Sequence, residues 1–265
     1  MPTITLMTDF GIKDGNVGVM KGVIWSICPE AHIADLSHVI GPQNIREAAL
    51  ILARSAPYFG SGTIHVVVVD PGVGTARRPM AGRIGDALYV GPDNGTITML
   101  LDRALAAKQP CEFVQLDNPM YRLPEVSHVF HGRDIFAPAA GHLAAGVPIS
   151  SLGPAFTDPV RIDLPKPIRS ARGLRGEVIH VDHFGNVASN IRIEDLRDVL
   201  KDRDKITVRL GQAEIRGLVD TFGERPVGER IALLGSTGNL IVSVVNGSAA
   251  QSLGAKVGDP FEVEF

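Results

Sequence analysis

The 265-residue chain has only two cysteines, Cys28 and Cys111, and they do not form a Cys-x-x-Cys pair. Two isolated cysteines make neither a disulfide framework nor a thiolate zinc site, and they fit a reducing compartment. No apolar run approaches the ~20 residues that a membrane-spanning helix needs. The N-terminal stretch has no basic segment and reaches Asp9 too early for a secretory signal peptide. These absences predict a cytoplasmic protein that has no membrane segment.

The chain also lacks a large excess of charge of either sign. The 26 basic residues are offset by 29 acidic ones, which leaves a net charge of −3, and the basic residues are scattered along the chain. Nucleic acids need a concentrated cationic surface, so the sequence does not predict a nucleic-acid partner. Hydrophobic residues make up 45% and charged residues 21%, which is ordinary for a globular protein. The length of the chain suits two domains.

The first part of the chain alternates short β-type runs with helical patterns. This alternation predicts an α/β domain over residues 1–165, with a largely parallel sheet and helices on both of its faces. Residues 154–167 contain four prolines and several charges, and we interpret them as the domain boundary. The strands are expected at residues 3–8, 32–36, 64–69, 87–90 and 112–116, and the helices at 16–28, 45–58, 96–107 and in the Ala-rich segment that ends near 145.

After the boundary the pattern changes to short β runs separated by glycine-containing turns. Residues 172–265 are therefore predicted to form a smaller all-β domain, either a sandwich or a barrel. The runs lie at residues 176–181, 206–210, 214–219, 231–234, 240–245 and 261–265.

The stretch from residue 64 to residue 78 combines a buried strand with ionisable side chains. Its continuous apolar run predicts a strand that is buried on both faces, and Asp70 follows directly at its carboxyl end. A turn rich in glycine comes next, and Arg77 lies seven residues beyond the aspartate. Open α/β sheets bind their ligands at such edges, so this is a candidate site; a capped turn with a surface ion pair is the alternative.

Two more ionisable residues stand at junctions between strands and helices. Asp9 follows the first predicted strand, and His131 precedes the Ala-rich helix. A parallel sheet would bring both to the same edge as Asp70 and Arg77.

Histidines also allow a metal interpretation. His128, His131 and Asp134 are spaced three residues apart and would supply two imidazoles and a carboxylate. Gly132 and the start of a helix break this pattern. His65 lies inside the buried strand and is expected to be a core histidine.

In the second domain, residues 182–187 are the densest candidate for ligand binding. Phe184 offers a stacking face, and Asn186 offers a donor and an acceptor to a planar heterocycle. A tight turn with a packed phenylalanine is the alternative. Phe222 and Ser236 also lie in turns, where a structural role is the simpler interpretation.

Five short motifs, in order along nearly the whole chain, resemble one protein family. They are Thr8-Asp9-Phe10-Gly11, Asp70-Pro71-Gly72-Val73-Gly74-Thr75 with Arg77-Arg78, Pro92-Asp93-Asn94-Gly95, Phe130-His131-Gly132-Arg133-Asp134 and Asp182-His183-Phe184-Gly185-Asn186. The family is the S-adenosyl-L-methionine hydroxide adenosyltransferases, or adenosine-forming S-adenosylmethionine hydrolases, which are homologous to fluorinases and chlorinases. Each motif alone is weak, whereas all five in this order are specific.

The resemblance implies a catalytic Asp-Arg-His triad, which falls on Asp70, Arg77 and His131. Halogenating relatives carry a tyrosine in place of Asp70 and, in place of Gly132, a serine that helps to hold the halide. The fluorinase also has a long insertion where this chain has only residues 79–86 between two strands. On all three counts the resemblance implies that water is the nucleophile.

The resemblance also implies substrate contacts. Asp9 would hold the ribose hydroxyls, Asp14 would lie near the methionine part, and Asp182 would meet the amino group. The family's site lies between the first domain of one subunit and the second domain of the next, in a homotrimer. The remaining implied contacts are Phe184, Asn186 and Phe222 around adenine and Ser236 near the carboxylate, while Thr237 and Val245 depart from residues that relatives carry there.

The implied reaction is hydrolysis of S-adenosyl-L-methionine to adenosine and L-methionine, without a metal or cofactor. We expect Arg77 to lower the pKa of Asp70, which makes that carboxylate a poor base, and His131 to accept or relay the proton of the water. Two alternatives stay open: a non-catalytic protein that binds an adenosyl ligand, and a metal-dependent hydrolase.

Overall fold

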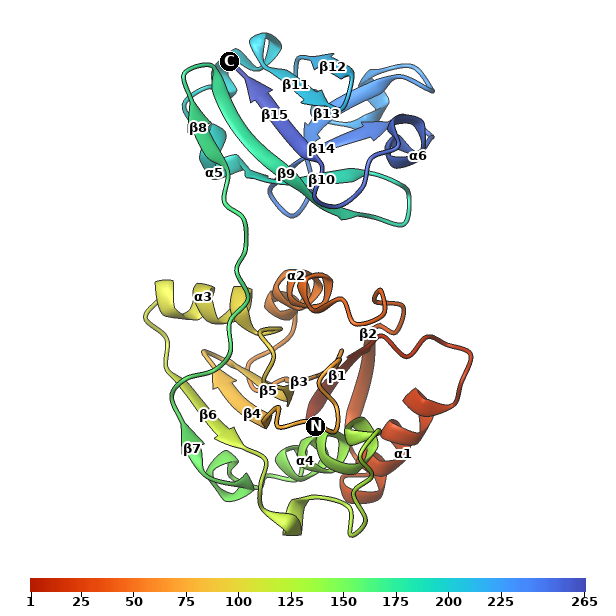
Figure 1. The fold of residues 1–265 in the computed structure, drawn as a ribbon, viewed down its shortest axis with the longest axis vertical. Helices are drawn as coiled ribbons and strands as arrows, with labels where there is room; N and C mark the ends of the chain where they lie inside the picture. Colours follow the sequence, from red (N-terminus) through yellow and green to blue (C-terminus); the bar gives the residue numbers. More distant parts are fainter. The chain divides into compact units, whose positions relative to one another are not determined.

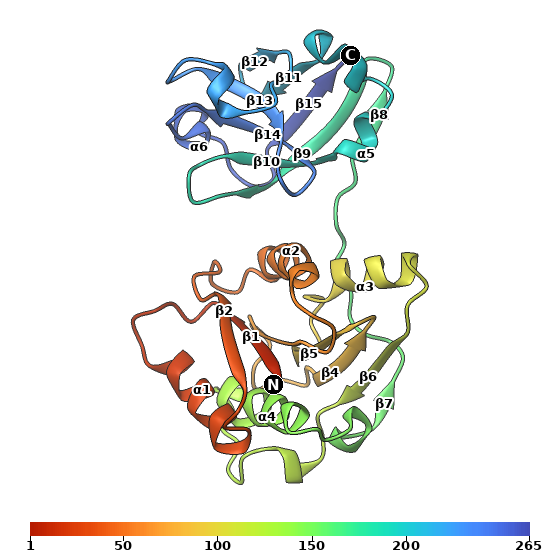
Figure 2. The same ribbon diagram turned by 180° about the vertical axis from the view of Figure 1, so that it is seen from behind.

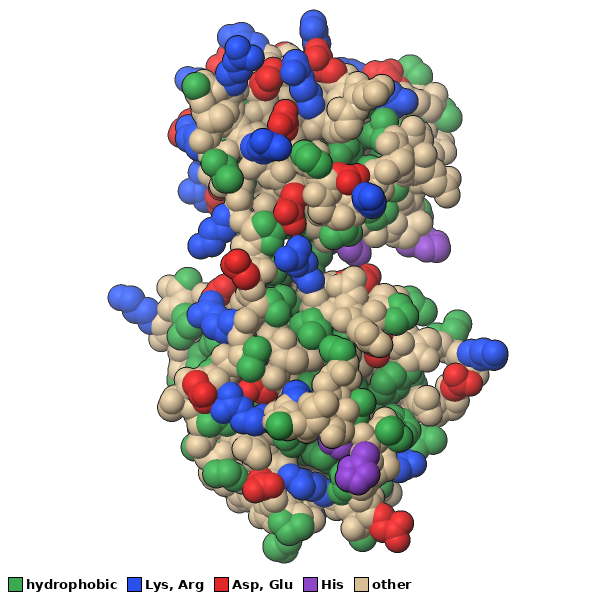
Figure 3. All heavy atoms as spheres, viewed as in Figure 1, with side chains coloured by type: hydrophobic (Ala, Val, Ile, Leu, Met, Phe, Trp, Pro, Cys, Tyr) green, Lys and Arg blue, Asp and Glu red, His purple; other side chains and the backbone are tan.

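A computed structural model describes all 265 residues, and the contacts within it divide the chain into two units, Met1–Ile162 and Asp163–Phe265. None of the helices combines the length and the apolar composition that crossing a bilayer requires. On the face drawn in Figure 3, acidic and basic side chains are interspersed over each unit.

The first unit is built on a mixed sheet of seven strands in the order β2-β1-β3-β5-β4-β6-β7. Neighbours among β2, β1, β3 and β5 pair in parallel, whereas β4 is antiparallel to both β5 and β6. β6 therefore runs in the direction of β5, so the five strands expected from the sequence share one direction. The strands are β1 (Thr3–Thr8), β2 (His32–Ser37), β3 (Ile64–Val68), β4 (Pro79–Ile84), β5 (Ala87–Pro92), β6 (Cys111–Gln115) and β7 (Ala155–Phe156).

Strand β4 corrects the interpretation of residues 79–86 as a mere connection. Pro79 opens the strand and Gly82 lies within it, and both residue types are unusual inside strands. The structure explains the glycine, because a Cβ at Gly82 would lie 2.7 Å from the ring of Phe113 on β6. A tight turn with Gly85 in the left-handed region (φ 59°) then joins β4 to β5.

Helices cover both faces of this sheet, as Figures 1 and 2 show. α1 and α4 pack together on one face, and α2 and α3 pack on the other. Val66 and Val68 of β3 join the core under α1 and α4, while Val67 and Val69 join the core under α2 and α3. This double burial accounts for the unbroken apolar run. The helices are α1 (Asn16–Ile27), α2 (Ile45–Ser55), α3 (Thr98–Ala106) and α4 (Ala137–Ala144).

The second unit is an antiparallel, nearly closed barrel in the order β12-β11-β15-β9-β10-β14-β13, with β8 added beside β9. β9 pairs with β15 over its first half and with β10 over its second half, and so curls the sheet. The predicted fold class, α/β followed by all-β, is confirmed. Its elements are β8 (Ile168–Ser170), β9 (Gly173–Val181), β10 (Val187–Arg192), α5 (Ile193–Leu196), β11 (Thr207–Leu210), β12 (Ala213–Arg216), β13 (Arg230–Leu234), β14 (Asn239–Val244), α6 (Ala249–Leu253) and β15 (Pro260–Glu264).

Candidate active site

Asp70, Arg77 and His131 form one hydrogen-bonded cluster. Arg77 Nε donates to Asp70 Oδ1 at 3.0 Å, and Arg77 Nη2 donates to Asp70 Oδ2. Arg77 Nη2 also lies 2.9 Å from His131 Nδ1. A Cβ at Gly74, which has φ 77°, would collide with the carbonyl oxygen of His128. Glycine therefore lets the turn after β3 lie against the segment that carries His131.

His131 immediately precedes a π-helical turn, Gly132–Phe136, which runs into α4. A π-turn is rare and changes the direction in which the first side chains of a helix point. The turn is anchored by Asp134, which is fully buried and accepts hydrogen bonds from Arg133 Nε at 2.5 Å and from the Ser127 amide at 2.8 Å. The local backbone thus aims the imidazole at Arg77 rather than leaving it in solvent.

Burial governs the titration of the cluster. The side chains of Asp70 and Arg77 are only 5% and 7% exposed. Burial raises the pKa of Asp70, and the opposing charge of Arg77 does not cancel this effect. The expectation that Arg77 would leave the Asp70 pKa below its ordinary value is therefore wrong, because desolvation of the carboxylate is the larger effect. Burial, together with the nearby Arg77 charge, lowers the pKa of His131.

The contact between Arg77 and His131 also fixes the hydrogen of the imidazole. A guanidinium can only donate, so His131 Nδ1 accepts, and the neutral ring carries its hydrogen on Nε2. In this state neither ring nitrogen is free to accept a proton, so the contact does not favour His131 as the acceptor of the water's proton. Arg77 Nη1 is buried and has no partner within the protein. Its N–H groups are the donors that the cluster leaves available for a small ligand such as water.

The adjacent arginine has a different role. Arg78 Nε donates to Asp93 Oδ2 at 2.8 Å, and its Nη1 donates to Asp158 Oδ1 at 2.8 Å. Its guanidinium carbon lies 4.2 Å from the centre of the Phe156 ring. Arg78 therefore ties the end of β5 to the segment after β7, and of the two arginines only Arg77 belongs to the cluster.

Asp9 follows β1, the strand that neighbours β3. Asp9 Oδ2 accepts a hydrogen bond of 2.7 Å from the Gln43 amide, which holds one oxygen of the carboxylate. The Phe10 ring packs edge-on against Phe130, with ring centres 5.7 Å apart. This contact places the end of β1 beside the segment of His131. Asp14 lies exposed in the loop before α1.

The metal interpretation is not favoured by these contacts. Asp134 is committed to Arg133 and Ser127, and the pKa of its buried carboxyl is lowered because their hydrogen bonds outweigh the effect of burial. The chain holds no group of three or more His, Cys, Asp and Glu side chains placed to bind a metal ion. His65 is a core histidine, as expected: it is 1% exposed, it lies 2.7 Å from Thr5 Oγ1, and burial lowers its pKa to about 4.

In the barrel, Phe184, Asn186 and Phe222 line one pocket of about 380 Å³. Phe184 is 74% exposed and Phe222 is 41% exposed, which is unusual for phenylalanine and typical of a binding surface. Asp182 shapes this pocket by accepting hydrogen bonds from the Phe184 amide at 2.9 Å and from Asn186 Nδ2 at 2.7 Å. The structure thus brings together the three residues expected around adenine.

The pocket also contains residues that the sequence analysis missed, namely Val244, Asn246 and Gly247. Asn246 has φ 52°, and the Asn-Gly pair after a β run was a turn signal that could have identified them. Ser236 is not part of this pocket. It is exposed in the turn before β14, beyond the end of that strand opposite Val244.

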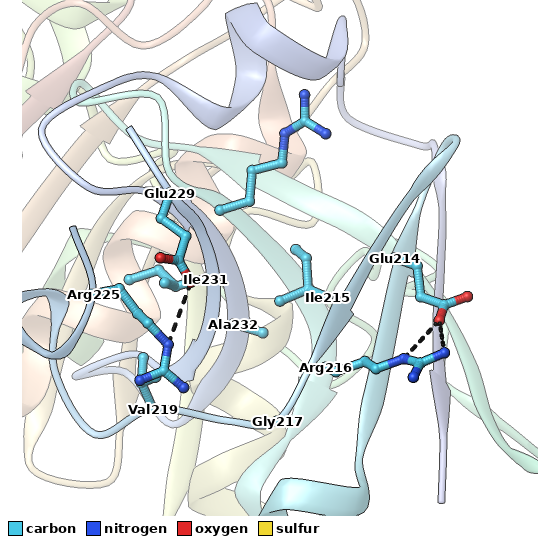
Figure 4. Close-up of a pocket in the computed structure, with 10 residues that line it drawn as sticks. Glu214, Ile215, Arg216, Gly217, Val219, Arg225, Glu229, Ile231 and Ala232 are labelled. Atoms are coloured by element: carbon cyan, nitrogen blue, oxygen red, sulfur yellow. Dashed lines mark hydrogen bonds and ion pairs between the residues drawn. The ribbon is translucent and has the colours of Figure 1, made fainter. Parts of the chain in front are cut away.

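A second hollow, of about 270 Å³, lies between the barrel's edge strands β12 and β13 (Figure 4). Arg216 is paired there with Glu214 at 3.1 Å, and Arg225 with Glu229 at 3.4 Å. It contains none of the expected site residues.

These features define a class. The first unit has a buried cluster of ionisable side chains at the carboxyl edge of an α/β sheet, and the second has an aromatic-lined pocket on a barrel. This combination is typical of a two-domain enzyme that acts on small molecules. The chain belongs to the SAM hydroxide adenosyltransferase family. The family's N-terminal domain matches residues 4–153 and its C-terminal domain matches residues 176–262, which confirms the resemblance of the five motifs.

Individual relatives agree with this assignment. A Salinispora tropica protein named (R)-S-adenosyl-L-methionine hydrolase is 41% identical over 99% of this chain and 97% of its own. A Thermus thermophilus protein of the same name is 40% identical over 98% of each chain. A fluorinase from an Actinoplanes species is 31% identical over 74% of this chain and 73% of its own. The crystal structure of an uncharacterized conserved protein from Thermotoga maritima, 36% identical, superposes with a TM-score of 0.89 over 99% of this chain and 100% of that one.

Proposed function

We propose that this protein hydrolyses S-adenosyl-L-methionine to adenosine and L-methionine. The single observation that carries the proposal is the buried Asp70–Arg77–His131 cluster, which a protein that merely binds an adenosyl ligand would not need. Full-length relatives named as hydrolases of this substrate support it. Their name specifies the R configuration at sulfur, and we propose the same epimer for this chain.

The proposed reaction is a displacement at the ribose 5′ carbon. A water oxygen forms the new C–O bond, the C–S bond breaks with its electron pair going to sulfur, and neutral methionine leaves without needing an acid. The charge on sulfur disappears during the step, so a site with little water favours it. We therefore propose that the reaction uses neither a metal nor a cofactor.

We assign the proton of the attacking water to Asp70. Burial raises the pKa of this carboxyl and so strengthens it as a base. Its oxygens accept from Arg77 and from the Gly72 amide, which still leaves a lone pair for the water. Arg77 Nη1 would hold the water oxygen, while His131 keeps Arg77 in place through Nδ1. The substrate-contact roles implied for Asp9, Asp14, Asp182 and Ser236 remain part of this proposal.

Product analysis tests the function. Purified protein incubated with either sulfonium epimer should release adenosine and methionine in equal amounts, faster from the R epimer. 5′-Methylthioadenosine as the nucleoside product, or an unchanged substrate, would contradict the proposal.

The pH dependence of turnover tests the choice of base. The raised pKa of Asp70 predicts that the rate falls with acidification at a pH above the ordinary carboxyl value of 3.8, because the protonated carboxyl cannot accept. The variant His131→Asn keeps an acceptor for Arg77 Nη2 and removes the imidazole. The turnover of this variant should be slower overall, but it should still fall with acidification over the same pH range as that of the wild type. A flat profile for His131→Asn would assign this fall, and the proton, to His131.

We also propose that the working form is a homotrimer in which the second unit of one subunit completes the site of its neighbour. The support is the division of the site residues: the triad lies in one unit, and the exposed phenylalanines of the pocket lie in the other. Light scattering should give three times the 28.2 kDa of the chain. A monomer that turns over substrate would contradict this arrangement.

We propose a small molecule as the only substrate partner, with no nucleic acid or membrane involved. Both cysteines are free, which agrees with a cytoplasmic location.

A further inference from the structure

Four polar side chains form a continuous network directly beneath the end of β1. Thr8 Oγ1 lies 3.0 Å from His38 Nδ1, and His38 Nε2 lies 3.0 Å from Asp35 Oδ1 in a bent contact. Asp35 Oδ2 accepts from Lys21 Nζ at 2.6 Å. Thr8 is fully buried and His38 is 8% exposed, so the inner part of the network is shielded from water.

The chemistry of these groups fixes the direction of the hydrogen bonds. A carboxylate only accepts, so His38 Nε2 carries the hydrogen that faces Asp35. In the neutral ring Nδ1 then accepts from the Thr8 hydroxyl, whose oxygen accepts from the Phe10 amide at 3.2 Å. From the Phe10 amide to Asp35, each donor therefore faces the next acceptor, and Lys21 donates to the same carboxylate from the other side.

The backbone of His38 makes a second contact with the segment that follows β1. The His38 carbonyl accepts from the Gly11 amide at 2.7 Å, and Gly11 needs the left-handed conformation (φ 70°) to reach it. Asp9 lies between these two anchored residues. The segment that begins at His38 also supplies the Gln43 amide that holds Asp9 Oδ2, and Gln43 has φ 63°, a strained conformation for a residue other than glycine.

We propose that His38 is a positioning residue, which acts through Thr8 and is anchored by Asp35, and which sets the Asp9 carboxylate in the orientation that binds the two hydroxyls of a ribose. This inference rests on the proposed function, since the ribose belongs to the proposed substrate. Neither Thr8 nor His38 needs to touch the ligand.

The test compares two probes that differ only in the diol, adenosine and 2′,3′-dideoxyadenosine, in calorimetric titrations of the full-length protein. The wild type should bind adenosine more tightly. Thr8→Val keeps the buried volume but removes the hydroxyl, and His38→Gln removes the group facing Thr8. Each should weaken adenosine binding about tenfold while changing dideoxyadenosine binding less than about twofold.

Two further variants complete the test, the first of them as a control. Thr8→Ser keeps the hydroxyl and should retain the wild-type preference for adenosine. Asp35→Ala changes a side chain that is 42% exposed, so it carries the test even where a core variant fails to fold. It should reduce the preference about two- to threefold, because the anchor of His38 is lost while Thr8 stays.

The outcomes separate the two levels of the proposal. Equal weakening of both probes, or no change of the preference in Thr8→Val, His38→Gln and Asp35→Ala, would overturn the role of His38. A wild-type protein that binds both probes equally would overturn the ribose contact at Asp9, and this inference with it. A wild type that binds neither probe would overturn the proposed function itself.

Discussion

Replacement of Arg77 by methionine should lower turnover roughly a thousandfold while leaving the affinity for adenosine within about tenfold. Arg77 donates to both oxygens of Asp70 and to His131 Nδ1, so its loss releases both partners together. It also removes the buried Nη1 donors proposed to hold the attacking water. Methionine keeps an unbranched stem about as far as Arg77 Nε and removes the guanidinium. The measurement is single-turnover kinetics beside calorimetric binding.

The neighbouring arginine provides a matched control. Arg78→Met breaks a pair with Asp93, whose side chain is 1% exposed, and should cost about 2 kcal/mol of the free energy of unfolding. Its turnover should stay near that of the wild type at temperatures where it is folded. Similar rate losses in the two variants would show that Arg77 acts through stability alone.

The triad should also behave as a unit. Asp70→Asn and His131→Ala should each lower turnover by between ten- and ten-thousandfold, and combining either with Arg77→Met should add little. If the losses in turnover instead multiplied independently, the three residues would be structural ion pairs and not one catalytic unit.

Several parts of the fold could be predicted because their sequence signals are local. The continuous apolar run of β3 identified a strand buried on both faces, and Asp70 at its end then followed from sheet geometry. β4 and β10 were missed because their apolar alternation is interrupted, by Gly82 in the first and by Ser189 and Asn190 in the second. Their stability comes from pairing with distant strands, which no local pattern records.

The site shows the same division. The motifs identified Asp70, Arg77 and His131, but the direction of the Asp70 pKa depends on burial, and the hydrogen of His131 depends on which nitrogen faces Arg77. Both are properties of the packed structure. The network behind Asp9 was likewise invisible, because Thr8 and His38 lie 30 residues apart in the chain.

The second large effect concerns the nucleophile. Excess chloride or fluoride should give no detectable 5′-halo-5′-deoxyadenosine. Arg77 is already paired with the buried Asp70 carboxylate, so its charge is not free to hold a halide. The carboxylate itself would repel a halide placed beside it, and this repulsion is strong where water is scarce. Gly132 offers no hydroxyl in compensation, and a Cβ there would lie 3.1 Å from Met20 Sδ and 3.2 Å from the Phe130 ring. A halogenated product formed at a rate comparable to adenosine would contradict this reasoning.

Hydrolysis in oxygen-18 water measures the central claim directly, since it reports which atom attacks and which bond breaks. Attack of a water held by Asp70 and Arg77 at the 5′ carbon predicts one heavy oxygen in adenosine and none in methionine, by mass spectrometry of both products. Adenosine without the label, or label in methionine, would show that the attacking group is not the water assigned to this site.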